Sequence, residues 1–384
     1  MDSNKIKKQY MSHKITFYPL GNADTTLIQL ENGKNILFDF ANTRDTNDVN
    51  DKRVDLPAEL NKSVTGSSYN VVAFSHADND HINGFSEFFY LEHAEKYQGK
   101  NRKKIDDLWV PAAVILETNL NGDAAILRAE AAYRLKNKQR IKVFSKPDKL
   151  KDWLEKEGIK PDEVKHLIVN AGTLVPGWML DTQGVEFFVH SPFAEHIDDR
   201  DIERNEACIV LQATFNNTYN SKVILGADAV ASLWDDIVSV TKYYKRETRL
   251  NWDIFHISHH CSYLSLNADD RGNPATVPTK KIKWLFEAQG NTKGKLISPS
   301  WEIPNKLEEV QPPHLEAANY YRAVANAKAG EFKVTMEFPN KEKPEPLVIE
   351  INDFGVSILK TVIPASFISS KPAPRAGDGR VSAN

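Results

Sequence analysis

The stretch that decides the fold is Val71-Val72-Ala73-Phe74-Ser75-His76-Ala77-Asp78-Asn79-Asp80-His81. Its first four residues are continuously apolar, which predicts a central strand that is buried on both faces. The next seven residues form a loop rich in polar donors, and a helix-like stretch, 85–90, follows. A strand, a donor-rich loop and a helix together make a rigid scaffold for a functional site.

The donors in this loop are of the types that bind divalent metal ions. His76, Asp78, Asp80 and His81 place four candidate ligands within six residues. Divalent ions in hydrolases need nitrogen and oxygen donors that converge on one point. Asp and Asn also favour turns, so a solvated polar loop is the alternative. Two histidines and two aspartates directly after a buried strand favour the metal site.

Two later segments also place polar donors just after predicted strands. Asp228 follows the apolar run 222–226, and His259 and His260 follow the run 253–258. Taken singly, each would more often be a capping aspartate or a structural histidine. Together with the first loop, they supply the carboxylate and imidazole that would complete a binuclear site.

The remaining pattern predicts a layered α/β sandwich. Further strands are expected at 15–20, 25–30, 35–40, 185–190, 207–215, 332–338 and 347–351. Apolar residues at three- and four-residue spacing predict helices at 124–135 and 148–157. We therefore expect a flexible N-terminus at 1–12, one domain at 13–365 with a helical insertion at about 91–165, and a disordered tail at 366–384.

Composition excludes several other classes of protein. The chain has 384 residues and a formal net charge of -3, so it has no global basic field of the kind that announces nucleic-acid binding. Two cysteines do not indicate a disulfide framework. The polar start and the lack of an apolar run of about 20 residues predict a cytoplasmic protein without a membrane segment.

The order of short motifs along the chain resembles a known superfamily. The motifs are Gly21–Leu27, Leu37-Phe38-Asp39, Ser75–His81, Asn205–Leu211, Gly226-Ala227-Asp228, Ser258–Ser262, Ser298-Pro299-Ser300 and Pro312-Pro313-His314. They resemble the motifs of the metallo-β-lactamase superfamily, and most of all its ComEC-like branch, the nuclease domain of competence DNA-uptake proteins. The resemblance spans about 15–314 and implies an αββα sandwich.

The resemblance also implies a set of metal ligands. These are His76, Asp78, Asp80, His81, Asp228 and His259, with Asp228 bridging two ions. They would hold zinc or manganese, one or two ions per chain. His259 is preferred to His260 because it lies closer to the strand.

Two departures from the superfamily pattern affect the first metal site. Asp78 stands where a second histidine is usual, and Asn205 is nearest to the position of a third-motif histidine. The second site keeps its donors, so we expect one firmly bound ion and one weaker ion. A first site rich in oxygen donors favours manganese or magnesium over zinc.

Hydrolysis follows from such a site, because bound divalent ions lower the pKa of coordinated water and polarise the bond under attack. The expected catalytic residues are Asp80, together with His260 or His314 as proton donor to the leaving group.

The leading hypothesis is a phosphodiesterase or nuclease with a nucleic-acid or nucleotide substrate. Basic stretches at 100–104, 134–142 and 242–246 could follow a phosphate backbone, although charge runs are usually solvated faces. The alternatives are a hydrolase of small esters, lactones or thioesters, and a metal-binding scaffold that acts through partners.

Overall fold

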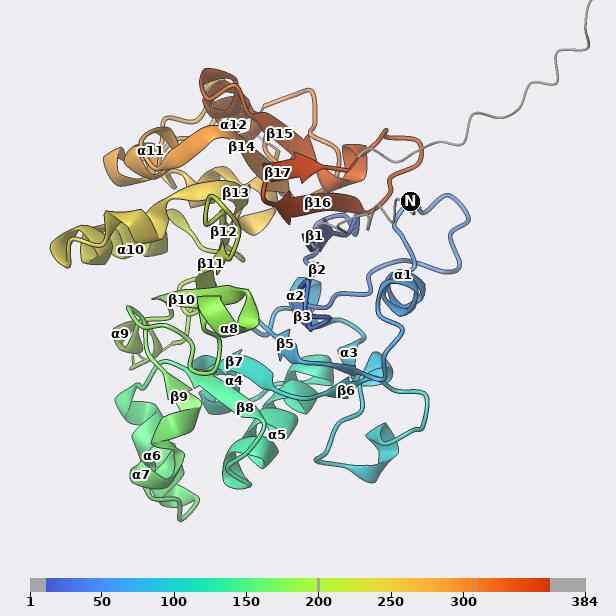
Figure 1. Cartoon of the computed structure of the whole chain (residues 1–384), viewed down its shortest axis with the longest axis vertical. Coiled ribbons are helices and arrows are strands. Elements are labelled where there is room, and N and C mark those ends of the chain that lie inside the picture. The colour runs from blue at the N-terminus through green and yellow to red at the C-terminus, as the bar shows by residue number, and fades with distance from the viewer. Residues whose placement is uncertain (1–11, 199–200, 308, 360–384) are drawn as a thin grey trace, which may run out of the picture.

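Two β-sheets form the centre of the molecule (Figure 1). The computed structural model describes residues 12–198, 201–307 and 309–359. The tail expected at 366–384, and all of the expected flexible N-terminus except Ser12, lie outside the described residues.

The first sheet has nine strands and contains the metal-loop strand β5. In spatial order the strands are β17 (Gly355–Ile358), β16 (Leu347–Asn352), β1 (His13–Phe17), β2 (Thr26–Gln29), β3 (Asn35–Phe38), β5 (Val71–Ala73), β7 (Leu108–Pro111), β8 (Ile141–Phe144) and β9 (Ile168–Val169). The pairs from β17 to β3 are antiparallel, and those from β3 to β9 are parallel. Gly33, with φ of 83°, lies in the expected turn between β2 and β3.

The second sheet has six strands and carries the later donor motifs. Its order is β10 (Val185–Ser191), β11 (Val210–Phe215), β12 (Lys222–Leu225), β13 (Trp252–His256), β14 (Gly290–Ser298) and β15 (Glu331–Val334). The strands from β12 to β15 are parallel neighbours. Because β12 and β13 end at the same edge, the loops that carry Asp228 and His260 are brought side by side.

The two sheets pack face to face, and the alternation of side chains along each strand explains why. In β3, Ile36 and Phe38 join the core between the sheets, whereas Leu37 points to the outer face. The Trp109 ring of β7 lies 5.4 Å from that of Phe187 in β10, measured between centroids. All of these side chains are buried, so the nine-stranded sheet is covered on both faces.

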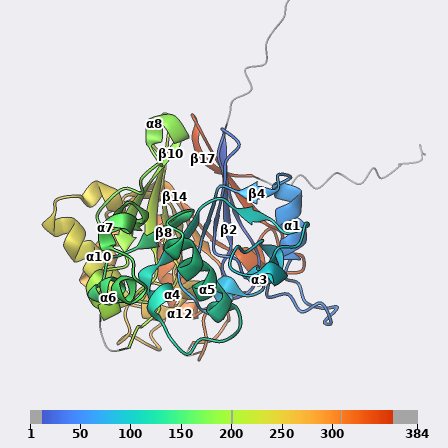
Figure 2. The same cartoon turned by 90° about the horizontal axis from the view of Figure 1, so that it is seen from below.

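Helices cover the two outer faces (Figure 2). On the nine-stranded sheet these are α1 (Leu56–Ser63), α3 (Phe85–Phe88), α4 (Ala112–Leu116), α5 (Gly122–Lys136) and α6 (Asp148–Lys156). On the six-stranded sheet they are α10 (Ala231–Tyr243), α11 (Lys280–Glu287) and α12 (Leu315–Ala327). The remaining α-helices and strands are short: α2 (Asn79–Ile82), α7 (Pro161–Val164), α8 (Leu180–Gln183), α9 (Ala194–Asp198), β4 (Ser68–Tyr69) and β6 (Lys104–Ile105).

The αββα sandwich expected from the sequence is confirmed by these layers. The helical insertion expected at about 91–165 needs correction, because β7 and β8 lie within it and extend the nine-stranded sheet. Each has only four residues, too few for a periodic pattern to separate strand from helix. In the described part of the chain, no helix has both the length and the apolar character needed to cross a bilayer.

Candidate metal centre

The loop after β5 is held by backbone hydrogen bonds from neighbouring segments. The amide of Asp24 donates to the carbonyl of Asp80 at 2.9 Å, and that of Phe40 donates to the carbonyl of His81 at 3.0 Å. Both acceptors belong to the short helix α2, which begins at Asn79. The backbones of Asp80 and His81, two of the candidate ligands, are thus held in place by the segments that follow β1 and β3.

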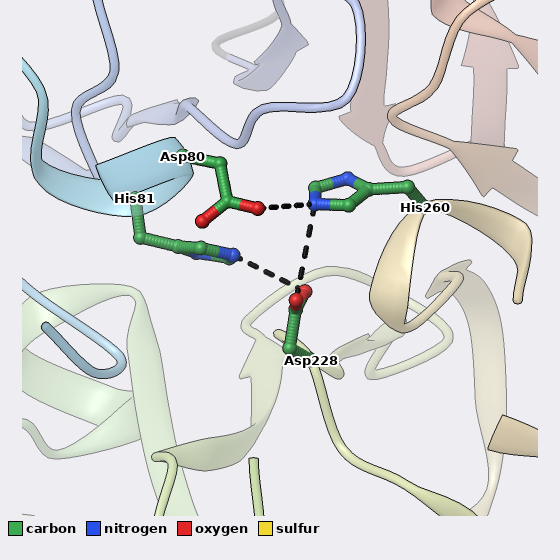
Figure 3. A group of neighbouring side chains, drawn as sticks. All are labelled: Asp80, His81, Asp228 and His260. Atoms are coloured by element: carbon green, nitrogen blue, oxygen red, sulfur yellow. Dashed lines mark hydrogen bonds and ion pairs between the residues drawn. The ribbon is translucent and has the colours of Figure 1, made fainter. Parts of the chain in front are cut away.

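Four donor residues converge at the edge where the two sheets meet. Asp80, His81, Asp228 and His260 each offer one ligand atom, and these atoms all lie within 4.8 Å of one another. Figure 3 shows the four side chains pointing towards one another from α2, from the loop after β12 and from the 3-10 helix η4 (His259–Cys261). We refer to these four residues as the metal cluster.

The distances within the metal cluster suit a shared cation. Nε2 of His260 lies 3.1 Å from Oδ2 of Asp80 and 3.8 Å from Oδ2 of Asp228. Nε2 of His81 lies 3.1 Å from Oδ1 of Asp228. Both atoms are buried, and apart from this ion-pair contact with each other neither has a hydrogen-bond partner within the described chain. A buried polar atom left unpaired costs about 1–3 kcal/mol, and a divalent ion would satisfy both atoms, so these residues fit the metal expected from the sequence.

Neighbouring groups set the orientation of both imidazoles. Nδ1 of His81 lies 2.9 Å from Oδ2 of Asp39, and Nδ1 of His260 lies 2.8 Å from the carbonyl oxygen of Pro299. An Nδ1–H that donates to an oxygen leaves Nε2 as the lone-pair atom, which is the arrangement typical of metal-binding histidines. In both residues the free nitrogen therefore faces the metal cluster.

Asp39 is a site residue that sequence analysis placed only in a strand motif. Its carboxylate accepts from the amide of Ser75 at 2.6 Å and from the Ser75 hydroxyl at 2.7 Å, as well as contacting His81. Asp39 has φ of 60°, a left-handed conformation that is rare for residues other than glycine, asparagine and aspartate. Asp39 and His81 are 42 positions apart in the sequence, so no short motif indicates that their side chains are in contact.

Asp24 adds a second carboxylate behind His81. Its Oδ1 lies 2.9 Å from Nε2 of His256, and its Oδ2 lies 3.8 Å from Nε2 of His81. Asp24, Asp39 and His81 form a second group of donors whose ligand atoms lie within 4.8 Å of one another. His81 is thus surrounded by carboxylates on several sides.

This charge arrangement shifts the pKa values in the metal cluster. Burial alone would lower the pKa of His81, but the carboxylates of Asp228 and Asp39 hold it well above its ordinary value. Burial likewise opposes protonation of His260, yet Asp228 and Asp80 raise its pKa to about 9. For Asp228, burial would raise the pKa, but His81 and His260 hold it well below the usual range. In the absence of an ion, protons on the two histidines therefore balance the carboxylates.

The first metal site expected from the sequence has a different arrangement. Nε2 of His76 lies 3.3 Å from Oδ2 of Asp78, while Oδ1 of Asp78 is ion-paired with Arg204. Burial would raise the pKa of Asp78, but His76 and Arg204 outweigh it and hold that pKa below its ordinary value. Neither donor group formed by the described residues includes His76 or Asp78.

The structure brings His260, and not His259, into the metal cluster. Sequence analysis preferred His259 as the ligand and gave His260 the role of proton donor. The backbone explains the difference, because His259, His260 and Cys261 have φ of 50°, 51° and 67°. Three successive left-handed residues turn the chain in a way that counting residues from the strand end cannot anticipate. His259 is partly exposed beside the cluster, and burial lowers its pKa.

His314, expected as an alternative proton donor, lies outside the metal cluster. Its Nδ1 accepts from the amide of Tyr263 at 3.4 Å, and its Nε2 lies 3.1 Å from the carbonyl oxygen of Glu309. Burial lowers the pKa of His314. With both ring nitrogens engaged by backbone groups, His314 joins the 3-10 helix η5 (Tyr263–Ser265) to the loop at Glu309 that precedes α12.

The fold and the metal cluster thus define an α/β sandwich protein with a candidate site for a divalent ion. The sequence matches no model of a known protein family and no curated protein.

The solved structures to which the chain is similar include three hydrolases. One is a diphosphatase of the PhnP family, with 10% identity, a TM-score of 0.36, and coverage of 90% of this chain and 100% of that one. Another is a Parabacteroides distasonis protein described as a metal-dependent hydrolase, with 8% identity, a TM-score of 0.33, and coverage of 85% and 97%. The third is a long-form RNase Z from yeast, with 12% identity, a TM-score of 0.29, and coverage of 82% and 40%.

Proposed function

We propose that this chain is a metal-dependent hydrolase of the metallo-β-lactamase superfamily that cleaves phosphodiesters in nucleic acids or nucleotides. The observation that carries the proposal is the metal cluster, in which four ligand atoms converge and buried His81 Nε2 and Asp228 Oδ1 have, in the described chain, no hydrogen-bond partner other than each other. Two imidazoles and two carboxylates form a donor set that zinc and manganese both accept.

Each residue of the metal cluster has a definable task. A divalent ion held there would act as a Lewis acid on the scissile group and would activate a water molecule. Asp80, His81, Asp228 and His260 would hold the ion, and Asp39 and the Pro299 carbonyl would keep the two imidazoles in the required tautomer. His259 has a lowered pKa and is neutral at pH 7, so it could accept a proton beside the cluster.

The choice of a phosphodiester substrate is supported by the order of motifs and by one surface. The motifs resemble most of all those of the ComEC-like nuclease branch. At the end of α10, Tyr243 and Tyr244 are 80% and 59% exposed, with ring centroids 5.0 Å apart. Lys242, Lys245 and Arg246 flank them in sequence. Exposed aromatic rings among positive charges suit the stacking of bases and the neutralisation of phosphates.

Space for a substrate adjoins the metal-binding loop. A pocket of about 290 Å³ is lined by Ala77, Asn79 and Ile82 of the loop, by residues 119–124 and by Arg204. Its wall contains the amide side chains of Asn79, Asn119 and Asn121, which can donate and accept hydrogen bonds. A nucleotide base or sugar beside the scissile phosphate could use these groups.

The test is manganese-dependent cleavage of single-stranded DNA by the parent protein and by Asp80→Ala and Asp228→Asn. Cleavage should be lost in both variants, whereas Asp152→Ala, at an exposed position on α6, should cleave like the parent. Failure of the parent to cleave DNA, RNA or small phosphodiesters would contradict the phosphodiesterase assignment. Turnover of esters, lactones or thioesters would then support the small-molecule alternative, and metal binding without any turnover would support the scaffold.

A further inference from the structure

Arg204 is bound on both sides in a way that the superfamily motifs do not anticipate. Its Nη1 donates to the carbonyl oxygen of Ala77 at 3.2 Å and to Oδ1 of Asp78. Its Nε lies 3.0 Å from each carboxylate oxygen of Glu117, the residue that ends α4, and its Nη2 also donates to Glu117. The guanidinium is therefore clamped between the metal-binding loop and α4.

This clamp places a fixed positive charge on Asp78, the carboxylate expected to serve the first metal site alone. A guanidinium keeps its proton throughout the range of pH at which proteins fold, so a positive charge shared with Glu117 stays in contact with Asp78 and offsets part of its negative charge. The Arg204 and Asp78 side chains are only 26% and 37% exposed, which limits the screening of their attraction by water. An ion that entered this site would meet a carboxylate whose charge is already partly offset and a cation within contact distance of it.

The other donors near Asp78 remain in place. The Ser75 hydroxyl donates its proton to Asp39 at 2.7 Å, so its contact with Nδ1 of His76, at 3.0 Å, requires the proton to lie on Nδ1. The other ring nitrogen, Nε2 of His76, faces Oδ2 of Asp78 at 3.3 Å. His76 Nε2 and Asn205 Oδ1 are both buried and unpaired in the described part of the molecule.

We propose that Arg204 is the built-in cation of the first site and that the protein works with a single divalent ion, held by Asp80, His81, Asp228 and His260. The inference rests on the proposed metal-dependent function and assigns the number of ions that it needs. It also gives Arg204 a defined task, which is to weaken a second ion by balancing the charge of Asp78. Removing the guanidinium should therefore turn a site for one ion into a site for two.

The experiment compares metal content in the parent, Arg204→Met and Arg204→Lys. Each protein is stripped with a chelator, titrated with manganese, and analysed for bound metal per chain and by electron paramagnetic resonance. The parent and Arg204→Lys should bind one tight ion with the spectrum of isolated manganese. Arg204→Met should bind the second ion roughly tenfold or more tightly than the parent does, with the spectrum of a spin-coupled pair.

Arg249→Met is the matched control, because Arg249 also pairs with a glutamate, Glu186, and is 28% exposed. This variant should bind one ion, and a cooperative thermal transition should show that each variant is folded. Two tight ions in the parent, or an unchanged single ion in folded Arg204→Met, would overturn the role of Arg204. Absence of any tight ion in the parent would instead contradict the proposed metal-dependent function itself.

Discussion

Asp228 lies between two imidazoles, and its carboxylate contacts a different histidine with each oxygen. Oδ1 lies 3.1 Å from His81 Nε2, and Oδ2 lies 3.8 Å from His260 Nε2. Asp228 is 3% exposed, so water contributes little to balancing its charge. At the scale of single residues, the chemistry of the site is a competition between protons and a metal ion for the same nitrogen atoms.

The two adjacent histidines should differ sharply in metal binding. His260→Ala removes a nitrogen that faces Asp80 and Asp228, so we expect metal affinity to fall by about tenfold to a hundredfold. His259→Ala leaves the four ligand atoms in place and should retain tight binding. Isothermal titration of the stripped proteins with zinc measures both. Equal losses in the two variants would contradict the assignment of His260 as the ligand.

The proton on His260 predicts a pH dependence with a definite sign. Its pKa is about 9 in the ion-free folded protein, above the ordinary value of 6.5. The stability that this proton contributes is complete below pH 6.5 and is lost as the pH rises to about 9. Metal must displace the same proton, so metal affinity should rise over that range.

Thermal melts at several pH values would check this prediction. From pH 6.5 to 9 the melting temperature of the stripped protein should fall, and the increase on adding zinc should grow. A His260→Gln variant should show a weaker dependence over the same range. A metal-induced increase that does not change with pH would contradict the proton competition.

At the scale of elements, the site depends on the close approach of two strand ends. A Cβ atom at Gly226 would lie 2.5 Å from the Ser258 hydroxyl oxygen and 2.7 Å from the His256 carbonyl oxygen. The amide of His259 also donates to the carbonyl of Ala227 at 3.0 Å. The loop with Asp228 and the η4 segment are therefore joined directly.

Gly226→Ala should separate these two segments. Because the His256 carbonyl belongs to the backbone of β13, we expect a loss of stability of about 1–3 kcal/mol together with weaker metal binding. Urea unfolding and metal titration measure the two effects. Gly66→Ala is the control, since a Cβ atom there meets nothing within 4 Å. A variant as stable and as metal-competent as the parent would show that the strand ends tolerate separation.

At the scale of elements, some strands could be predicted from the sequence, whereas other strands and contacts could not. The strands next to the donor motifs could be predicted because runs such as 71–73 and 222–225 consist mainly of apolar residues, as expected of buried strands. β14 was missed, since its first half, Gly290–Lys293, is polar or glycine. The partnership of Arg204 with Asp78 joins residues 126 positions apart, and the choice of His260 depends on backbone angles. Neither has a local sequence signal.

At the scale of the whole molecule, the metal cluster draws its donors from both halves of the sandwich. Asp80 and His81 follow β5 of the nine-stranded sheet, whereas Asp228 and His260 follow β12 and β13 of the six-stranded sheet. An ion held by all four residues would join the two sheets at their shared edge. Metal binding should therefore stabilise the fold as a unit.

Chelation should lower the melting temperature of the entire cooperative transition. An ion present at a hundred times its dissociation constant stabilises the folded state by about 2.7 kcal/mol. Differential scanning calorimetry with zinc and with a chelator measures the shift. Asp80→Asn, which lacks one ligand, should show a much smaller shift. Unfolding that splits into two transitions on chelation would mean that the sheets fold as separate units.

The distribution of the donors along the chain has a consequence for biosynthesis. A ribosome that has made the first half of the protein has produced Asp80 and His81 but not yet Asp228 or His260, which come after residue 225. The nine-stranded sheet is itself completed late, because β1 pairs with β16 at Leu347–Asn352. The nascent chain therefore lacks the complete set of four donors until most of it has been translated, and an ion that needs all four would be bound late, by a nearly finished protein.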